Sequence, residues 1–235
     1  MRVFAGPNGS GKSTVFEMVS RSFDLGTYIN PDLIERALKV SGHYSLETSD
    51  CATTEIEFSS FLSNHSLNKK ARSIGLQLSM SVNDNVISCP REEVSSYHAS
   101  CIADFLRTKL ISAGKKLTFE TVMSHPSKLE ILDFALSRQF KNYLYFVCTS
   151  SPDINITRVK QRVALGGHSV PENLITERYF KSLGQLKSAV KRTHRAFIWD
   201  NSGKKPVLIA EVTNGKEILI HHSEIPAWAD QYLLS

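Results

Sequence analysis

Apolar runs alternate with helix-like patterns along most of the chain. Runs rich in β-branched and aromatic residues predict strands at Arg2–Ala5, Thr27–Asn30, Lys116–Glu120, Tyr143–Cys148, Ala196–Asp200 and Val207–Val212. Apolar residues three and four positions apart predict helices at Ser13–Ser22, Pro31–Val40, Glu93–Ala113, Ser127–Arg138, Pro152–Leu165 and Pro171–Arg192. This alternation predicts an α/β protein with a mostly parallel sheet. The turn Asn214-Gly215 predicts a final hairpin strand at Glu217–Ile220.

The region from Gly42 to Glu92 breaks this alternation. Within it, apolar and polar residues alternate strictly, with apolar side chains at Ile74, Leu76, Leu78, Met80 and Val82. A turn-like segment, Asn83-Asp84-Asn85, follows. We therefore expect a β-hairpin at 74–86, inserted between the second and third strands. It serves to cover a substrate, to bind a partner, or only to extend the fold.

A glycine-rich segment, AGPNGSGKST, joins the first predicted strand to the first predicted helix. It contains the pattern G-x-x-x-x-G-K-[ST], in which backbone N–H groups surround phosphates, a lysine reaches the β- and γ-phosphates and a hydroxyl binds Mg²⁺. The segment therefore predicts a site for ATP and Mg²⁺, with Ser13 as the metal ligand. The predicted ATP-binding residues are Gly6, Pro7, Asn8, Gly9, Ser10, Gly11, Lys12, Ser13 and Thr14.

Two carboxylates lie where the second and third predicted strands end. Asp32 begins the helix after the second strand, and Glu120 ends the third strand, just before Thr121. Ligands of open parallel sheets bind beyond the carboxyl ends of the strands. Asp32 is therefore a candidate base for an acceptor hydroxyl. The alternative is that Asp32 only satisfies N–H groups at the start of its helix.

Basic side chains recur at helical spacing between the fourth and fifth strands. Two pairs share helix faces, Arg158 with Arg162 and Arg178 with Lys181. We predict that residues 151–192 form a lid that brings cations to a transferring phosphate. The alternative is a pair of solvated helices whose arginines make weak surface ion pairs. His168, beside two glycines, is expected to be a turn or lid contact.

The segment WDNSG follows the strand that ends at Asp200. Asn201 and Ser202 either contact the base of the nucleotide or close an Asx-type turn.

Composition limits the classes of protein that remain. With 235 residues, 41% hydrophobic and 22% charged, we expect one globular domain over 1–235, with the insertion at about 42–92. No apolar run reaches the roughly 20 residues of a membrane span. The net charge of +5 suits a phosphate-rich ligand, but the basic residues are scattered, which argues against nucleic acid as the partner.

The four cysteines are widely spaced and none forms C-x-x-C, so neither zinc nor a disulfide framework is predicted. This cysteine usage, and a chain that begins inside a predicted strand, lead us to expect a reduced, cytoplasmic protein without a signal peptide. Either that first strand is short or further residues precede it.

Taken together, these motifs resemble those of the zeta-toxin-like P-loop kinases, a family that includes a bacterial branch of predicted ATPases. The matching segments are AGPNGSGKST (Ala5–Thr14), INPD (Ile29–Asp32), FETVMS (Phe119–Ser124), RVKQRVALGGHSVPENLITERYFKSL (Arg158–Leu183) and DNSG (Asp200–Gly203). The combination is more specific than the phosphate loop alone. The chain departs from the toxins in the lid and in the long Gly42–Glu92 region, and both bear on the choice of acceptor.

The resemblance implies a P-loop kinase fold, a three-layer sandwich that binds ATP and Mg²⁺. Toxin members phosphorylate a sugar hydroxyl of UDP-N-acetylglucosamine or related nucleotide sugars, and a small antitoxin blocks their ATP site. Carried over by motif, Lys12 contacts phosphate, Asp32 is the catalytic base, and Glu120 and Thr121 lie on the substrate side. Arg162 and Arg178 correspond to the arginines that clamp the phosphate.

Three functions therefore stay open. The first is a kinase that phosphorylates a hydroxyl of a small molecule. The second is an ATPase or nucleotide-dependent switch that acts with a protein partner, for which the predicted hairpin offers a surface. The third is a polynucleotide kinase, which the scattered charge disfavours.

Overall fold

The structure is a computed structural model that describes residues 1–47, 52–167 and 169–235. Its contacts divide the chain into two compact units. Unit 1 comprises Met1–Leu25 and Thr118–Ser235, and unit 2 comprises Gly26–Leu117. His168 and Cys51 lie outside the described residues, so the turn or lid contact expected of His168 stays a prediction.

The sheet of unit 1 confirms the predicted mostly parallel arrangement. Its strands follow the order β10-β9-β8-β7-β1-β6. The pairs β1–β6, β1–β7 and β7–β8 are parallel, whereas β9 and β10 run antiparallel to their neighbours. The strands are β1 (Arg2–Ala5), β6 (Leu117–Thr121), β7 (Tyr143–Cys148), β8 (Arg195–Asp200), β9 (Val207–Thr213) and β10 (Glu217–Ile220). The predicted β9–β10 hairpin is confirmed, with Asn214 and Gly215 at positive φ.

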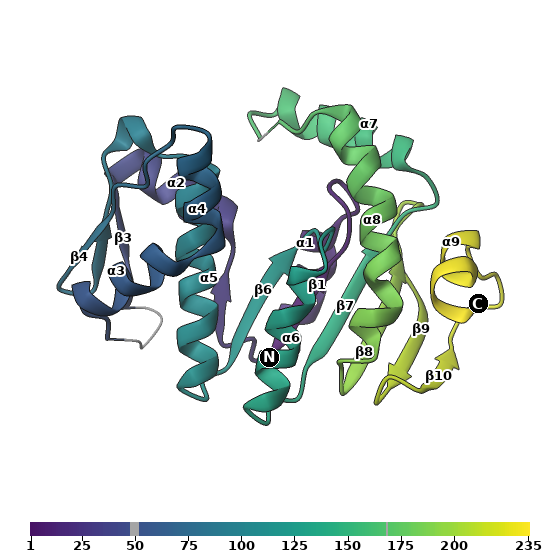
Figure 1. The fold of residues 1–235 in the computed structure, drawn as a ribbon. Helices are drawn as coiled ribbons and strands as arrows, with labels where there is room; N and C mark the ends of the chain where they lie inside the picture. The colour runs from purple at the N-terminus through teal and green to yellow at the C-terminus, as the bar shows by residue number, and fades with distance from the viewer. Residues whose placement is uncertain (48–51, 168) are drawn as a thin grey trace. The chain divides into compact units, whose positions relative to one another are not determined.

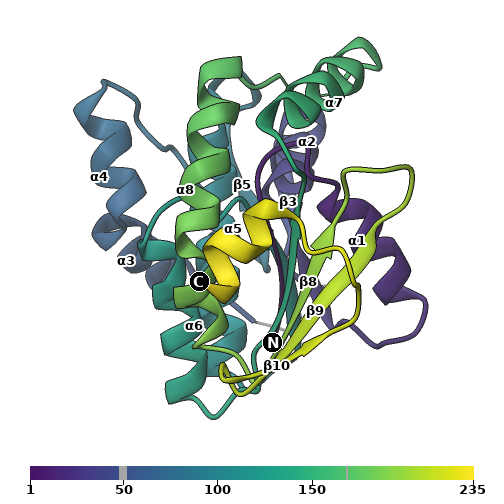
Figure 2. The ribbon, with the colours of Figure 1, turned by 90° about the vertical axis from the view of Figure 1, so that its right-hand side faces the viewer.

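Helices cover both faces of this sheet and complete a three-layer arrangement (Figure 1). In Figure 2, which is turned by 90°, α1 lies on one side of the strands and α6 and α8 lie on the other. The helical segments of unit 1 are α1 (Lys12–Ser20), α6 (Ser127–Ser137), α7 (Pro152–Ala164), α8 (Glu172–Val190), α9 (Ala227–Ala229) and the π-helix η3 (Asp230–Leu234).

The centre of unit 1 is apolar because the middle strands are buried on both faces. On the α1 side, the Phe4 ring stacks on Tyr145 with centroids 4.6 Å apart, and Tyr145 stacks on Phe197 at 5.0 Å. Such aromatic contacts add to the free energy of apolar burial. They fix the strands whose carboxyl ends lead into the phosphate loop and the α7–α8 helices.

Unit 2 combines helices with a small antiparallel sheet of order β3-β5-β4. It also contains a strand and a 3-10 turn. Its elements are β2 (Thr27–Ile29), α2 (Pro31–Ser41), β3 (His43–Ser45), α3 (Glu55–Asn64), α4 (Ser66–Ser73), β4 (Ser81–Asn83), β5 (Val86–Ser88), η2 (Arg91–Glu93) and α5 (Ser96–Ser112). Phe58 and Phe105 meet edge to face in its core, at 5.1 Å.

The hairpin predicted at 74–86 is present but much shorter. Asp84 and Asn85 form its turn at positive φ, and Val82 pairs with Ile87. The first part of the prediction is wrong, because the strand begins at Ser81 and Ile74 caps helix α4 with 63% of its surface exposed. Strict alternation is meaningful only when one face is buried, and here the apolar residue that opens the pattern faces solvent.

Helices α3 and α4 were not predicted from the sequence. The start of α3 carries a recognisable signal, since the Thr54 side chain accepts a hydrogen bond from the N–H of Glu57, and Phe58 and Leu62 are buried at i, i+4 spacing. A capping residue followed by this spacing is typical of a helix start.

Candidate functional site

The predicted phosphate loop lies between β1 and α1. Three of its glycines have positive φ: Gly6 at 140°, Gly9 at 77° and Gly11 at 90°. Because residues with a side chain rarely adopt these conformations, the loop requires glycine there. Helix α1 begins at Lys12 without a side-chain cap, so its first turn presents uncapped N–H groups. Such a helix start attracts anions.

Polar groups converge on this loop. The Lys12 ammonium donates to the carbonyls of Gly6 at 2.9 Å and Pro7 at 3.0 Å, so the charge sits over the loop. The Ser10 hydroxyl is buried and has no hydrogen-bond partner among the described residues. A buried hydroxyl without a partner is costly, and a ligand oxygen would satisfy it. Ser13 and Thr14, in the first turn of α1, are exposed.

Two asparagines hold the loop from outside the predicted motif. The Asn155 side chain, on α7, donates to the carbonyl of Asn8 at 2.7 Å. The Asn201 side chain, after β8, donates to the carbonyl of Ser10 at 2.8 Å. Asn155 was not singled out from the sequence, because a helical asparagine carries no local signal of a partner so far away along the chain.

Glu120 and Thr121 lie beside the start of the loop. In the parallel pairing of β1 with β6, they are opposite Phe4 and Ala5. The N–H of Gly6 donates to the carbonyl of Thr121 at 3.3 Å. Both side chains are partly exposed. The predicted location at the carboxyl edge of the sheet, next to the loop, is therefore observed for these two residues.

The basic residues of α7 and α8 differ in what they contact. Arg178 donates to the side-chain oxygen of Asn8 at 3.4 Å, which links α8 to the loop. Arg158 donates to the carbonyl of Gly203, also at 3.4 Å, and its second terminal nitrogen is buried without a partner among the described residues. Arg162 is exposed near the end of α7.

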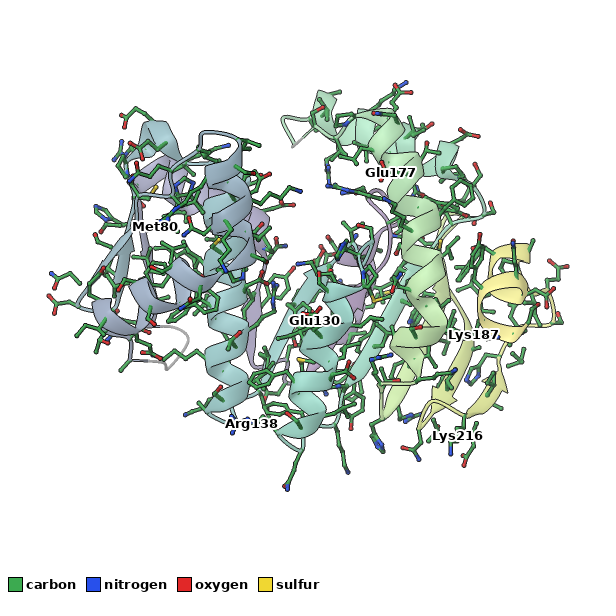
Figure 3. The ribbon with its side chains drawn as sticks, viewed as in Figure 1. Met80, Glu130, Arg138, Glu177, Lys187 and Lys216 are labelled. Atoms are coloured by element: carbon green, nitrogen blue, oxygen red, sulfur yellow. The ribbon has the colours of Figure 1, made fainter. Side chains whose placement is uncertain are left out.

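Lys181 does not join this group. It forms an ion pair with Glu177, four residues earlier on α8. Figure 3 labels Glu177 on this helix. Another ion pair, between Lys160 and Glu172 at 2.7 Å, joins α7 to α8. Lys181 therefore matches the alternative given in the sequence analysis, in which a basic residue of these helices makes a surface ion pair.

The segment after β8 combines a turn with a loop contact. The N–H of Ser202 donates to the Asp200 carboxylate at 3.1 Å, which is the expected Asx-type turn. The Trp228 indole donates to the same carboxylate at 3.0 Å. Meanwhile Asn201 turns toward the phosphate loop. The turn alternative is thus observed, and the contact of Asn201 is with the loop backbone.

Two titratable groups behind the loop stay neutral. Burial raises the pKa of the Cys148 thiol to about 12, and burial also raises the pKa of Tyr179 above its ordinary range. The neutral Tyr179 hydroxyl donates to the carbonyl of Thr149 at 2.6 Å. These groups support the site from within the core and do not supply a charge or a base.

Asp32 belongs to unit 2, so its approach to the loop stays a prediction. It is exposed in the first turn of α2. The cap of that helix is Asn30, whose side-chain oxygen accepts from the N–H of Asp32 at 2.9 Å. The alternative that Asp32 caps its own helix therefore does not hold, since Asn30 does so.

Among the residues that the structure describes, no cluster of three or more His, Cys, Asp or Glu side chains could hold a metal ion. Mg²⁺ bound with nucleotides usually keeps several waters and takes only one or two protein ligands besides the phosphates, and Ser13 is the ligand predicted from the sequence. In the described part of the chain, no helix is long and apolar enough to span a membrane.

A strand, a glycine-rich loop and a helix on a mostly parallel sheet, with helices on both faces, define the P-loop NTPase fold of the kinase type. No protein-family model matches the sequence, and no curated protein matches it. Solved structures do share the fold. A chain of the AvrRxo1-ORF1:AvrRxo1-ORF2 complex with sulphate ions has a TM-score of 0.56 at 13% identity, over 94% of this chain and 60% of that one.

A second structure of that complex, with ATP, gives a TM-score of 0.54 at 14% identity, over 93% of this chain and 59% of that one. A structure from the PezAT chromosomal toxin–antitoxin system of Streptococcus pneumoniae gives 0.51 at 12% identity, over 100% of this chain and 78% of that one. The chain thus spans about 60% of the length of the AvrRxo1 chains. At these identities the likeness shows the fold.

Proposed function

We propose that the protein is an ATP-dependent phosphotransferase of the zeta-toxin-like kind, which moves the γ-phosphoryl group of ATP to a hydroxyl of a small molecule. The observation that carries the proposal is the phosphate loop itself. Its glycines adopt the required positive φ, Lys12 lies over it, and the buried hydroxyl of Ser10 lacks a partner among the described residues. These features fit a bound phosphate chain.

The cations support transfer in addition to binding. Arg178 contacts the loop at Asn8, and Arg162 lies on the neighbouring helix. A transferring phosphoryl group spreads negative charge over its oxygens, and positioned arginines stabilise that charge. We assign Arg178 and Arg162 to this role, Lys12 to the β- and γ-phosphates, and Ser13 to Mg²⁺.

Asp32 is the proposed base. Its carboxylate is exposed and its helix is capped by Asn30, so it is available to take the proton of an acceptor hydroxyl. The hydroxyl oxygen forms the new bond to phosphorus as the bond from phosphorus to the leaving oxygen breaks, and ADP departs. Glu120 and Thr121, beside the loop, would contact the acceptor.

A nucleotide sugar such as a UDP-N-acetyl sugar is the acceptor class that the resemblance favours. The fold is also that of a chain from a toxin–antitoxin system. We also propose that the protein has an antitoxin-like protein partner and a cytoplasmic location. Residues 1–235 are proposed to form a single functional domain.

The proposal is tested with γ-labelled ATP and Mg²⁺, first with the protein alone and then with nucleotide sugars, nucleosides and oligonucleotides in turn. Label on a nucleotide sugar, lost in Asp32→Ala, supports the kinase and gives its acceptor class. Free phosphate that no acceptor changes would favour the ATPase or switch. Label on oligonucleotides alone would favour a polynucleotide kinase.

A further inference from the structure

The backbone of the phosphate loop is bonded at two of its carbonyls by buried asparagines from distant parts of the chain. Asn155 is fully buried and Asn201 is 6% exposed. Their amide groups reach the carbonyls of Asn8 and Ser10. Because a carbonyl only accepts, the nitrogen of each amide must face it. The Asn155 oxygen in turn accepts from the Thr149 hydroxyl, which fixes the orientation of that amide.

The neighbouring glycines make room for these asparagines. A Cβ atom on Gly9 would lie 2.5 Å from the backbone oxygen of Asn155, and a Cβ on Gly11 would lie 2.0 Å from the side-chain nitrogen of Asn201. Real Cβ atoms essentially never show contacts under 3.0 Å, so a side chain at either position would force the asparagine to shift. Gly9 and Gly11 are therefore required by the packing of the asparagines as well as by their positive φ.

Each hydrogen bond fixes a whole peptide unit. In a planar trans peptide, the carbonyl and the N–H point in opposite directions. Holding the Asn8 carbonyl toward Asn155 turns the N–H of Gly9 the other way, and holding the Ser10 carbonyl toward Asn201 does the same for Gly11. Among the hydrogen bonds between described residues, neither of these N–H groups donates to the protein.

We propose that Asn155 and Asn201 are positioning residues for phosphate: by holding the carbonyls of Asn8 and Ser10, they aim the N–H groups of Gly9 and Gly11 at the ligand. The inference rests on the proposed function, because it concerns the same loop. Without the two amides, the peptide units are free to rotate, and the carbonyl oxygens can turn toward the phosphates and repel them.

A matched control lies elsewhere in unit 1. Asn142 is also fully buried, and its side chain donates to the carbonyls of Leu132 and Arg192, both at 3.0 Å. Neither of those carbonyls belongs to the phosphate loop. Replacing Asn142 therefore removes the same kind of buried hydrogen bond without touching a loop peptide.

The experiment compares Asn155→Leu, Asn201→Leu and Asn142→Leu, which are neutral and similar in size to the wild-type residue. Alanine variants at the same positions serve if a leucine variant does not fold. Melting temperature gives stability, and calorimetric titration gives the affinity for ATP and for pyrophosphate. The amide ¹H–¹⁵N signals of Gly9 and Gly11 report whether pyrophosphate still reaches these groups.

We expect all three variants to melt at lower temperature. We expect the two loop variants, and not Asn142→Leu, to lose about tenfold in affinity for both ligands, the usual effect of one or two hydrogen bonds. The Gly9 and Gly11 signals should shift with pyrophosphate in the wild type and in Asn142→Leu, and shift less in the loop variants.

Unchanged affinity in folded loop variants would overturn the inference while leaving the proposed function intact. An equal loss in Asn142→Leu would also overturn it, because the effect would then be general destabilisation. A wild-type protein that binds neither ATP nor pyrophosphate would refute the proposed function, and this inference with it.

Discussion

Buried polar side chains have different partners in the two compact units. In unit 1, Asn155 and Asn201 donate to the backbone of a loop that has no regular structure of its own. In unit 2, several polar side chains pair with one another. Arg107 is 6% exposed and forms an ion pair with Asp104, and burial lowers the pKa of Arg107 to about 10.

Partly buried and exposed side chains of unit 2 form further pairs. The Asp104 carboxylate lies 3.4 Å from the His65 imidazole, and Lys109 reaches the Thr53 hydroxyl at 2.9 Å and Glu57 at 2.6 Å. These contacts connect helices to each other and to the segment before α3. The comparison indicates that replacing Asn155 or Asn201 affects ligand binding as well as stability, whereas replacing the paired side chains of unit 2 affects stability.

The largest expected effect is at Lys12. Lys12→Ala should abolish phosphoryl transfer, because the lysine supplies the positive charge at the β- and γ-phosphates. Its ammonium now bonds to loop carbonyls in a part-buried position, so we expect the melting temperature to change by only a few degrees. Transfer assays and thermal melts on the same sample check this. A variant with half the wild-type rate would contradict the assignment.

The second largest effect on the transfer rate is expected at Arg178. Arg178→Ala should lower the transfer rate by about 10³-fold, since a positioned arginine stabilises the transition-state charge. The matched control is Lys181→Ala, one turn along α8, where the lysine is exposed and paired with Glu177. Its rate should stay within about twofold of the wild type. Equal losses in both variants would show that α8 contributes only general positive charge.

Asp32 tests whether a residue of unit 2 can act on the reaction, because it is exposed and has a proposed catalytic role. Asp32→Asn should lower the transfer rate by at least about 10²-fold, the usual effect of losing a general base. ATP affinity and melting temperature should be nearly unchanged, since Asn30 caps the helix. Full transfer to the true acceptor in this variant would remove Asp32 from the mechanism.

The smallest effect is expected at His98, which is buried at the start of α5 and accepts a hydrogen bond from the N–H of Ser95 at 3.2 Å. Burial lowers the pKa of His98, against a weaker opposing effect of the Glu93 carboxylate. The folded protein therefore keeps His98 neutral while the unfolded chain takes up a proton below its ordinary pKa of about 6.5. The contribution to stability is complete above that pH and declines as the pH falls below it.

The matching variant is His98→Gln, because glutamine at this position preserves the capping box and removes the titration. Melting temperatures from pH 8 to pH 5 should fall less steeply for the variant than for the wild type, while ATP affinity at pH 8 stays the same. Parallel curves would show that other groups set the acid sensitivity.

How far the sequence predicts the fold differs between the units. In unit 1, periodic apolar patterns and turn residues located β1, β7 and β10 at their observed bounds. The strands β1 and β7 are buried and have strong local preferences that agree with their surroundings, whereas the exposed β10 was located by the turn at Asn214 and Gly215. In unit 2, α3 and α4 were missed and most of the predicted strand was wrong. Leu78 and Val82 are buried, but Ile74 is exposed, so the alternation did not correspond to one buried face.

The sequence by itself determined the phosphate loop, because positive φ at glycines, a lysine at a fixed offset and an uncapped helix start are all properties of nearby residues. Only the tertiary structure decided which side chains complete that loop. Asn155 and Asn201 meet it across 147 and 191 positions of the chain. The strand order and the packing of α7 and β8 bring residues together across such separations. Both depend on apolar burial throughout unit 1 rather than on any local sequence pattern.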